Sequence, residues 1–296
     1  MNIVDAHHHI WRQADLPWLT GPMQPRIFGP YGAIRRDYGI AEYRDDVRGT
    51  GVVQSVYVQA NWPVERFADE VAWVQSVADE TGWPQGIVGY CDMTQPDARP
   101  ALDRLTRHPA MRGIRQQLHW HENPLYRFAA SPDLARDPTV RRNVSRLADY
   151  GWSFDLQVFA GQMPGATELA AACPNVTFVL QHAGMPEDLS ESGWTLWRSG
   201  MRQLASRPNV VSKLSAFGTF LHRNDPDHIA RLVGETVSIF GADRCLYGSN
   251  FPIEKLWTPY RALLDAFRAA ARDLSDAEQR AVFADTARRV YRLSDM

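Results

Sequence analysis

The chain alternates between short apolar runs and longer amphipathic segments along almost its whole length. The apolar runs have the length and composition of β-strands, and segments with helical spacing separate most of them. The eight expected strands span residues 2–6, 52–60, 86–92, 112–118, 152–158, 176–182, 210–215 and 244–249. Strands that alternate with helices are joined by helical crossovers and therefore run parallel. Eight of them within 296 residues favour a closed (β/α)8 barrel over an open sheet.

Nothing in the sequence divides the chain into parts. We find no linker, low-complexity stretch or charge block, so residues 1–296 are expected to form a single domain. Residues 16–38 follow the first strand and are rich in proline, glycine and aromatic residues. A long loop in that position is expected to lie over the mouth of the barrel like a lid.

Composition argues against several classes of protein. The formal net charge is −2 and no segment concentrates Lys and Arg, so neither nucleic acid nor a membrane is expected as a partner. No apolar run approaches the roughly 18 residues of a membrane helix, and we expect no signal peptide. Cys91, Cys173 and Cys245 are far apart and odd in number, which favours a reduced, cytoplasmic protein. The oligomeric state stays open, with a homo-oligomer among the alternatives.

Side chains along a barrel strand alternate between the lumen and the surrounding helices. In the first strand this count puts Asp5 on the same face as His7 and His9, and in the sixth it puts Phe178 and Leu180 on the face that leads to His182. The aliphatic face of each strand is expected to pack on the helices. The polar side chains expected at the barrel mouth are His7, His9, Arg115, Gln117, Gln157, His182, Lys213 and Asn250. Such a lining is costly unless it binds a ligand, and barrel active sites lie at this end.

The pair His7-x-His9 puts two imidazoles on one face, about 7 Å apart, close enough to share a metal ion or a substrate oxygen. His182 ends the run FVLQH and would complete a set of three imidazoles. The alternative for the pair is an accidental histidine run in a polar terminus. The alternative for His182 is a hydrogen-bonded structural role.

Two cations and one amide have open roles. Arg115 and Lys213 either clamp a carboxylate or a polarised carbonyl, or form buried ion pairs, with Asp155 or Asp92 as the candidate partner. Asn250 lies in YGSNFP, where it is either a turn residue or a site residue that orients water. An amide cannot act as a carboxylate base.

Further side chains are expected to contact the substrate. Trp62 follows a strand and is expected in the wall of a small-molecule pocket, with core packing as the alternative. The complete expected substrate-binding set is Arg115, Lys213, Gln59, Gln117, Gln157 and Trp62.

Six segments, taken in order, resemble the amidohydrolase superfamily: DAHHHIW, RGIRQQL, FDLQV, FVLQHAGMP, VVSKLS and CLYGSNFPI. They are most similar to its amidohydrolase-related (amidohydrolase 2) branch, which includes sugar-acid and dicarboxylate lactonases. The resemblance covers nearly the whole chain and implies a distorted (β/α)8 barrel that hydrolyses a small lactone. It also implies that His7, His9 and His182 bind a metal or, in metal-independent members, hold substrate and water, and that a cation at Arg115 contacts the substrate.

Two positions depart from the family pattern. The final strand of the family usually ends G-S-D-W-P, whose Asp is the proton-transfer base, whereas this chain has Asn250 there. Gln181 stands where an acidic residue often precedes the histidine. Three alternatives remain open for a chain without this aspartate base: His182 serves as the base, a metal lowers the pKa of water, or the chain catalyses an easier reaction or none. Two alternatives are kept for the cofactor. One is a divalent ion, with zinc as the first candidate, bound by His7, His9 and His182, and the other is metal-independent action.

The favoured function is hydrolysis of a small lactone, sugar-acid or muconolactone-like, by an activated water. In this hypothesis His7, His9 and a lumen cation stabilise the oxyanion, His182 relays the proton and Asn250 orients the water. The second hypothesis is a metal-dependent decarboxylase or C–C hydrolase of an aromatic or dienoic acid. The third is a non-catalytic binder of a small molecule. The substrate is expected to be anionic or polyhydroxylated.

Overall fold

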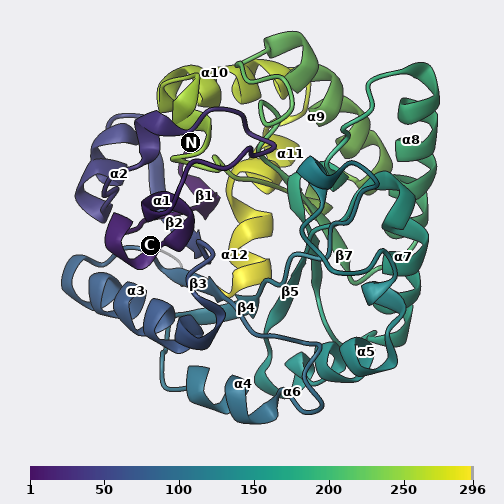
Figure 1. The fold of residues 1–296 in the computed structure, drawn as a ribbon. Coiled ribbons are helices and arrows are strands. Elements are labelled where there is room, and N and C mark those ends of the chain that lie inside the picture. Colours follow the sequence, from purple (N-terminus) through teal and green to yellow (C-terminus); the bar gives the residue numbers. More distant parts are fainter. Residues whose placement is uncertain (295–296) are drawn as a thin grey trace.

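The computed structural model describes residues 1–294 and contains one eight-stranded parallel sheet whose strands follow the order of the chain (Figure 1). The strands are β1 (Ile3–His8), β2 (Val52–Val58), β3 (Gly86–Gly89), β4 (Met111–Ile114), β5 (Ser153–Leu156), β6 (Phe178–Leu180), β7 (Val210–Leu214) and β8 (Cys245–Tyr247). The first and last strands meet near their carboxyl ends, where the amide of Asn250 donates to the carbonyl of His7 at 2.7 Å. The predicted single-domain (β/α)8 barrel is confirmed.

Helices surround the barrel (Figure 1). They are α2 (Ile40–Asp46), α3 (Phe67–Thr81), α4 (Arg99–Leu105), α5 (Pro138–Ser145), α6 (Leu147–Tyr150), α7 (Met163–Ala172), α8 (Glu191–Ala205), α9 (Pro226–Phe240) and α10 (Tyr260–Ala270). Helix α3 ends at Gly82, whose φ of 74° is the left-handed conformation that glycine favours at a helix end. Helix α5 begins after Asp137, whose carboxylate accepts from the amides of Thr139 and Val140. Within residues 1–294, no helix is long and apolar enough to cross a membrane.

The C-terminal segment covers the amino ends of the strands. It consists of α11 (Asp276–Arg280), a π-helical turn (Ala281–Asp285) and α12 (Thr286–Tyr291). In Figure 1, α12 crosses the centre of the barrel. The strand side chains that share one buried cluster with this segment are Val4, Ala6, Val56, Val58, Val88, Val179, Val211 and Leu246. The part of the lumen at the amino ends of the strands is therefore filled by aliphatic side chains.

The expected faces of β1 are wrong in part. Val4 and Ala6 point into the lumen, whereas Asp5 points outward and accepts from the hydroxyls of Tyr43 on α2 and Tyr260 on α10 at 2.9 and 3.0 Å. The pairing of β1 with β2 is irregular between Asp5 and His8. This irregularity lets His7 turn inward although a regular strand would place it on the side of Asp5.

The expected face of β6 is also wrong. Val179 belongs to the inner cluster, whereas Phe178 and Leu180 pack in the outer core. His182 nevertheless reaches the barrel mouth. Its backbone is left-handed, with φ 56°, as is that of Ala183. Strand β6 therefore ends before His182, and the alternation of side chains along a strand does not determine which way this histidine points.

A buried ion pair lies above the aliphatic layer. The ammonium of Lys213 on β7 lies 2.9 Å from Asp155 Oδ2 on β5, and both side chains are fully buried. Asp155 also accepts from Gln181 Nε2 at 2.8 Å and from the hydroxyl of Tyr291 on α12 at 3.1 Å. Of the two roles considered for Lys213, the structure shows the ion pair with Asp155.

This pair generates a stability prediction. Replacing Asp155 with Ala leaves the Lys213 ammonium buried without its partner, so the free energy of unfolding should fall by about 3–5 kcal/mol. Urea unfolding measures the change. The control is Glu168→Ala, which removes a half-exposed partner of Arg136 and Arg141 and should cost less than about 1 kcal/mol. Similar losses in the two variants would contradict the account.

Candidate active site

A cavity of about 110 Å³ opens at the carboxyl ends of the strands. Barrel enzymes place their catalytic residues at this end. Six of the expected site residues line the cavity: His9, Arg115, Gln117, Gln157, His182 and Asn250. Aromatic and apolar side chains form much of the remaining wall, among them Trp11, Trp18, Phe28, Phe217 and Phe220.

The three predicted histidines lie together. The ring of His7 is 5.1 Å from that of His9 and 4.9 Å from that of His182, between centroids. His7 is fully buried and does not line the cavity itself. Neither of its ring nitrogens has a hydrogen-bond partner among the described residues. His7 therefore forms the floor beneath the two rings that face the cavity.

Hydrogen bonds orient the two upper imidazoles. Nδ1 of His9 lies 2.6 Å from the carbonyl oxygen of Val58. Because a carbonyl only accepts, this nitrogen carries the proton and Nε2 of neutral His9 keeps its lone pair. Nδ1 of His182 lies 2.8 Å from the hydroxyl of Ser215. The structure thus favours His9 as an acceptor rather than as a donor to an oxyanion.

Burial and nearby cations keep these histidines uncharged. Burial lowers the pKa of His9 to about 3, and the charge of Arg115 acts in the same direction. The pKa values of His7 and His182 also lie well below the ordinary value, first through burial and then through Lys213 and Arg115 respectively. All three imidazoles are therefore neutral near pH 7 and available as proton or hydrogen-bond acceptors.

Arg115 provides a cation at the cavity wall. One of its terminal nitrogens donates to the carbonyl of Gln59 at 2.5 Å, and its Nε has no partner within residues 1–294. Burial lowers the pKa of Arg115 to about 10, which leaves the guanidinium charged at neutral pH. Gln59 itself lies behind this arginine, with its side-chain oxygen on the amide of Asn61 at 2.6 Å.

Three of the expected substrate-binding side chains lie away from the cavity lining. They are Gln59, Lys213 and Trp62. Trp62 packs against Trp73, with ring centroids 6.0 Å apart, and under the guanidinium of Arg66. For Trp62 the structure therefore shows core packing, which was the alternative role considered from the sequence.

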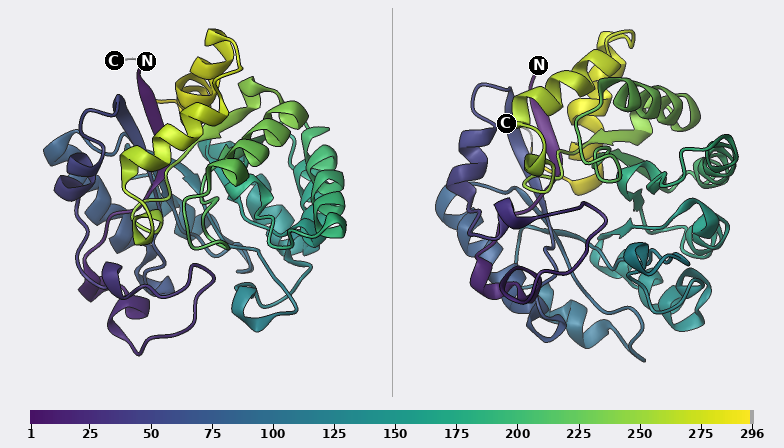
Figure 2. Two further views of the ribbon diagram at one scale, coloured as in Figure 1. Left: turned by 90° about the horizontal axis from the view of Figure 1, so that it is seen from above. Right: turned by 45° about the horizontal axis from the view of Figure 1, so that its top comes forward.

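Residues 16–38 lie across the cavity. Figure 2 shows this purple segment at the end of the barrel opposite the two termini. It contains α1 (Pro17–Thr20) and supplies Trp18, Arg26, Ile27 and Phe28 to the cavity wall. His222 Nε2 donates to the carbonyl of Ile27 at 2.9 Å and ties the segment to the loop after β7.

Arg26 was not expected in the site from the sequence. It forms no ion pair with any residue between 1 and 294, and its Nε is buried without a partner. Its guanidinium lies 5.8 Å from the centre of the Trp18 ring. In the sequence Arg26 is one of three arginines, with Arg35 and Arg36, in a segment rich in proline and glycine. Strand alternation does not extend to such a segment, so nothing in the pattern singles out Arg26.

The sequence model of the amidohydrolase family matches residues 4–293. The chain belongs to this family. It is 36% identical to an uncharacterised protein, y4mH, of Sinorhizobium fredii over 98% of both chains. It is 29% identical to an L-fucono-1,5-lactonase of Burkholderia multivorans over 99% of this chain and 96% of that one. The crystal structure of an amidohydrolase from Burkholderia multivorans with bound zinc has a TM-score of 0.83 at 27% identity, covering 99% of this chain and all of the other.

The donor set of this amidohydrolase does not suit a divalent ion. In residues 1–294, no group of three His, Cys, Asp or Glu side chains is arranged to hold a metal. The three imidazoles that the sequence analysis considered as ligands lie beside Arg115 and above Lys213. No aspartate or glutamate of the described chain lines the cavity. A divalent ion would therefore add charge to an already positive site without an anionic ligand, and we derive no step through a metal.

Proposed function

We propose that this amidohydrolase hydrolyses a small anionic lactone by attack of water on the ring carbonyl. The observation that carries the proposal is the meeting of neutral imidazoles with the Arg115 guanidinium in an aromatic-walled cavity. The lactonase relative, similar over nearly the whole chain, supports the same reaction class. The donor set described above gives no support to the metal-dependent decarboxylase considered from the sequence.

In the proposed reaction, His182 takes a proton from the attacking water while a bond forms between the water oxygen and the carbonyl carbon. The lone pair on Nε2 of His9 accepts a hydrogen bond from the same water and holds it in place. Arg115 stabilises the negative charge that develops on the carbonyl oxygen. The ring carbon–oxygen bond then breaks, His182 returns the proton to the leaving oxygen, and the product is a hydroxy acid.

Three further side chains support this geometry. His7 lies beneath both rings and limits their movement. Gln157 offers its side-chain oxygen, which has no hydrogen-bond partner among the described residues, to a substrate donor. Gln117 presents a second amide at the same wall. In this proposal Gln59 and Lys213 lie behind the cavity wall. Gln59 holds Arg115 through its backbone carbonyl, and Lys213 holds Asp155 through their ion pair.

The charge of the cavity indicates the class of substrate. Arg26 reaches the cavity from residues 16–38, and Arg115 reaches it from the carboxyl end of β4. Since no acidic side chain in the described lining neutralises them, an anionic substrate is favoured. Muconolactone carries a carboxylate beside its lactone ring, whereas L-fucono-1,5-lactone carries hydroxyl groups and no charge. The aromatic wall suits the flat ring of the former.

The role of His182 is tested by His182→Gln. Losing the proton acceptor should lower kcat on muconolactone by about 10² to 10⁴-fold, because general-base catalysis contributes on that order. The assay is ring opening followed by absorbance, after subtraction of uncatalysed hydrolysis. The control His108→Gln lies away from the cavity and should change kcat less than about twofold. If a panel of charged and neutral lactones gives no turnover with the unaltered protein, while one of them raises its Tm, the chain is a binder and the proposal fails.

The substrate class is tested by Arg26→Ala. The variant loses a charge-assisted contact worth about 1.5–3 kcal/mol, so KM for muconolactone should rise by about 10- to 100-fold. KM for L-fucono-1,5-lactone, if it is turned over, should change less than about threefold. The control is Arg12→Ala, which removes a cation outside the cavity lining. Equal effects on both lactones would contradict a carboxylate contact at Arg26.

A further inference from the structure

Ser215 lies behind His182, at the carboxyl end of β7. It follows Leu214, the last residue of that strand, and its side chain is fully buried. Its Oγ lies 2.8 Å from Nδ1 of His182, and this is the only hydrogen bond of the Ser215 side chain within residues 1–294. Ser215 does not line the cavity, so it can act on a substrate only through His182.

In the described part of the chain, Ser215 is also the one group that hydrogen-bonds to the imidazole of His182. The backbone of His182 is left-handed, with φ 56°, so the regular geometry of β6 does not orient the ring. The neighbouring ring of His7, 4.9 Å away between centroids, makes no hydrogen bond through either nitrogen to the described residues. The orientation of the His182 ring therefore depends on its contact with Ser215.

This contact is compatible with two tautomers of neutral His182. Either Nδ1 carries the proton and donates to Ser215, or the serine hydroxyl donates to Nδ1 and the proton is on Nε2. His182 lines the cavity and Ser215 does not, so Nε2 is the nitrogen on the cavity side. Only the first tautomer leaves a lone pair there that can take a proton from water.

The charges around the ring favour the tautomer with the proton on Nδ1. Arg115 lines the same cavity, and its guanidinium attracts a lone pair on Nε2 of His182, whereas it repels a hydrogen there. After burial, the charge of Arg115 is the largest cause of the lowered pKa of His182. The other nearby cation, Lys213, is paired with Asp155 at 2.9 Å. The cation without an anionic partner therefore lies on the side of Nε2.

We propose that Ser215 is a positioning residue that holds the proton of His182 on Nδ1 and leaves the lone pair of Nε2 for the attacking water. The proposal rests on the proposed lactone hydrolysis. The lone pairs on Nε2 of His9 and of His182 then face the two hydrogens of one water molecule. As the water oxygen bonds to the carbonyl carbon, one of its O–H bonds breaks and that proton binds to Nε2 of His182. The Nδ1 hydrogen keeps donating to Ser215, which stabilises the imidazolium until Nε2 passes the proton to the leaving ring oxygen.

The variant Ser215→Ala tests this role in the reaction. The imidazolium loses one charge-assisted hydrogen bond, so kcat on muconolactone should fall by about 10- to 100-fold. KM should change less than about threefold, because Ser215 does not reach the substrate. The matched control is Ser212→Ala on the same strand, where the serine is also fully buried but its hydroxyl has no hydrogen-bond partner among the described residues. The control should keep kcat within about twofold, and equal losses in the two variants overturn the proposal.

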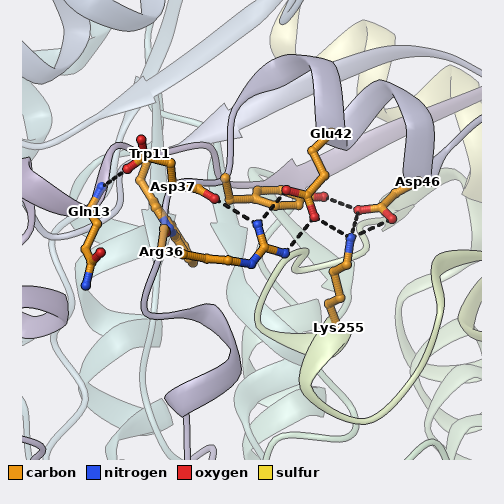
Figure 3. A network of polar contacts seen from close by, with 8 residues as sticks. Trp11, Gln13, Arg36, Asp37, Glu42, Asp46 and Lys255 are labelled. Atoms are coloured by element: carbon orange, nitrogen blue, oxygen red, sulfur yellow. Dashed lines mark hydrogen bonds and ion pairs between the residues drawn. The ribbon is translucent and has the colours of Figure 1, made fainter.

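A second control separates positioning of His182 from a general loosening of the barrel mouth. Lys255, in the segment that follows β8, binds Glu42 and Asp46 on α2, with its ammonium 2.8 and 2.7 Å from their oxygens (Figure 3). Lys255→Met breaks this network without removing a contact of His182, so it should lower the Tm and keep kcat within about threefold. A loss of kcat as large as that in Ser215→Ala would assign the effect to loosening and contradict the role of Ser215.

A measurement without substrate separates this proposal from the proposed reaction. In protein labelled with ¹⁵N in its histidines, NMR identifies which ring nitrogen carries the proton, and the signals absent from His182→Gln belong to His182. At about pH 7 the proton should be on Nδ1 in the unaltered protein, whereas Ser215→Ala should show Nε2 protonated in part of the molecules. A proton on Nε2 in the unaltered protein, or an unchanged pattern in Ser215→Ala, overturns the proposal whether or not any lactone is hydrolysed. The predicted tautomers without turnover contradict only the reaction.

Discussion

The buried ion pair of Lys213 and Asp155 divides the interior of the barrel into two parts. Below it, valines from the strands pack against the C-terminal helices, and Tyr291 reaches up to Asp155 from α12. Above it lies the cavity with its imidazoles. The Lys213 charge adds to burial in keeping His7 neutral, so the same pair that supports the fold also sets the protonation of the site floor. The cost of burying two charges is offset only while both are present.

The regular part of the fold could be predicted from the sequence because alternation of apolar runs and helical segments determines topology. All eight strands were found in this way, and alternation correctly placed Lys213 and Arg115 inside the barrel. It failed where the backbone is irregular. The break in pairing after Asp5 and the left-handed conformation of His182 each reverse the face that a regular strand would present.

From the sequence, site residues could be predicted only where they lie at the carboxyl ends of strands. Six expected residues line the cavity, but Arg26 comes from an irregular segment with no periodicity to read. Asn250 itself has φ 58°, a conformation that asparagine tolerates better than most residues. Such strand-end conformations depend on tertiary contacts rather than on local sequence.

The central claim is that uncharged imidazoles and an arginine, without a metal, activate water in a positively charged cavity. The most direct test is hydrolysis of muconolactone by protein whose metal content has been reduced below about a tenth of an ion per chain by chelation and checked by mass spectrometry. The account predicts a kcat within about twofold of that before chelation, and no gain on adding zinc. Loss of activity on chelation, with recovery on adding one equivalent of zinc, would contradict it.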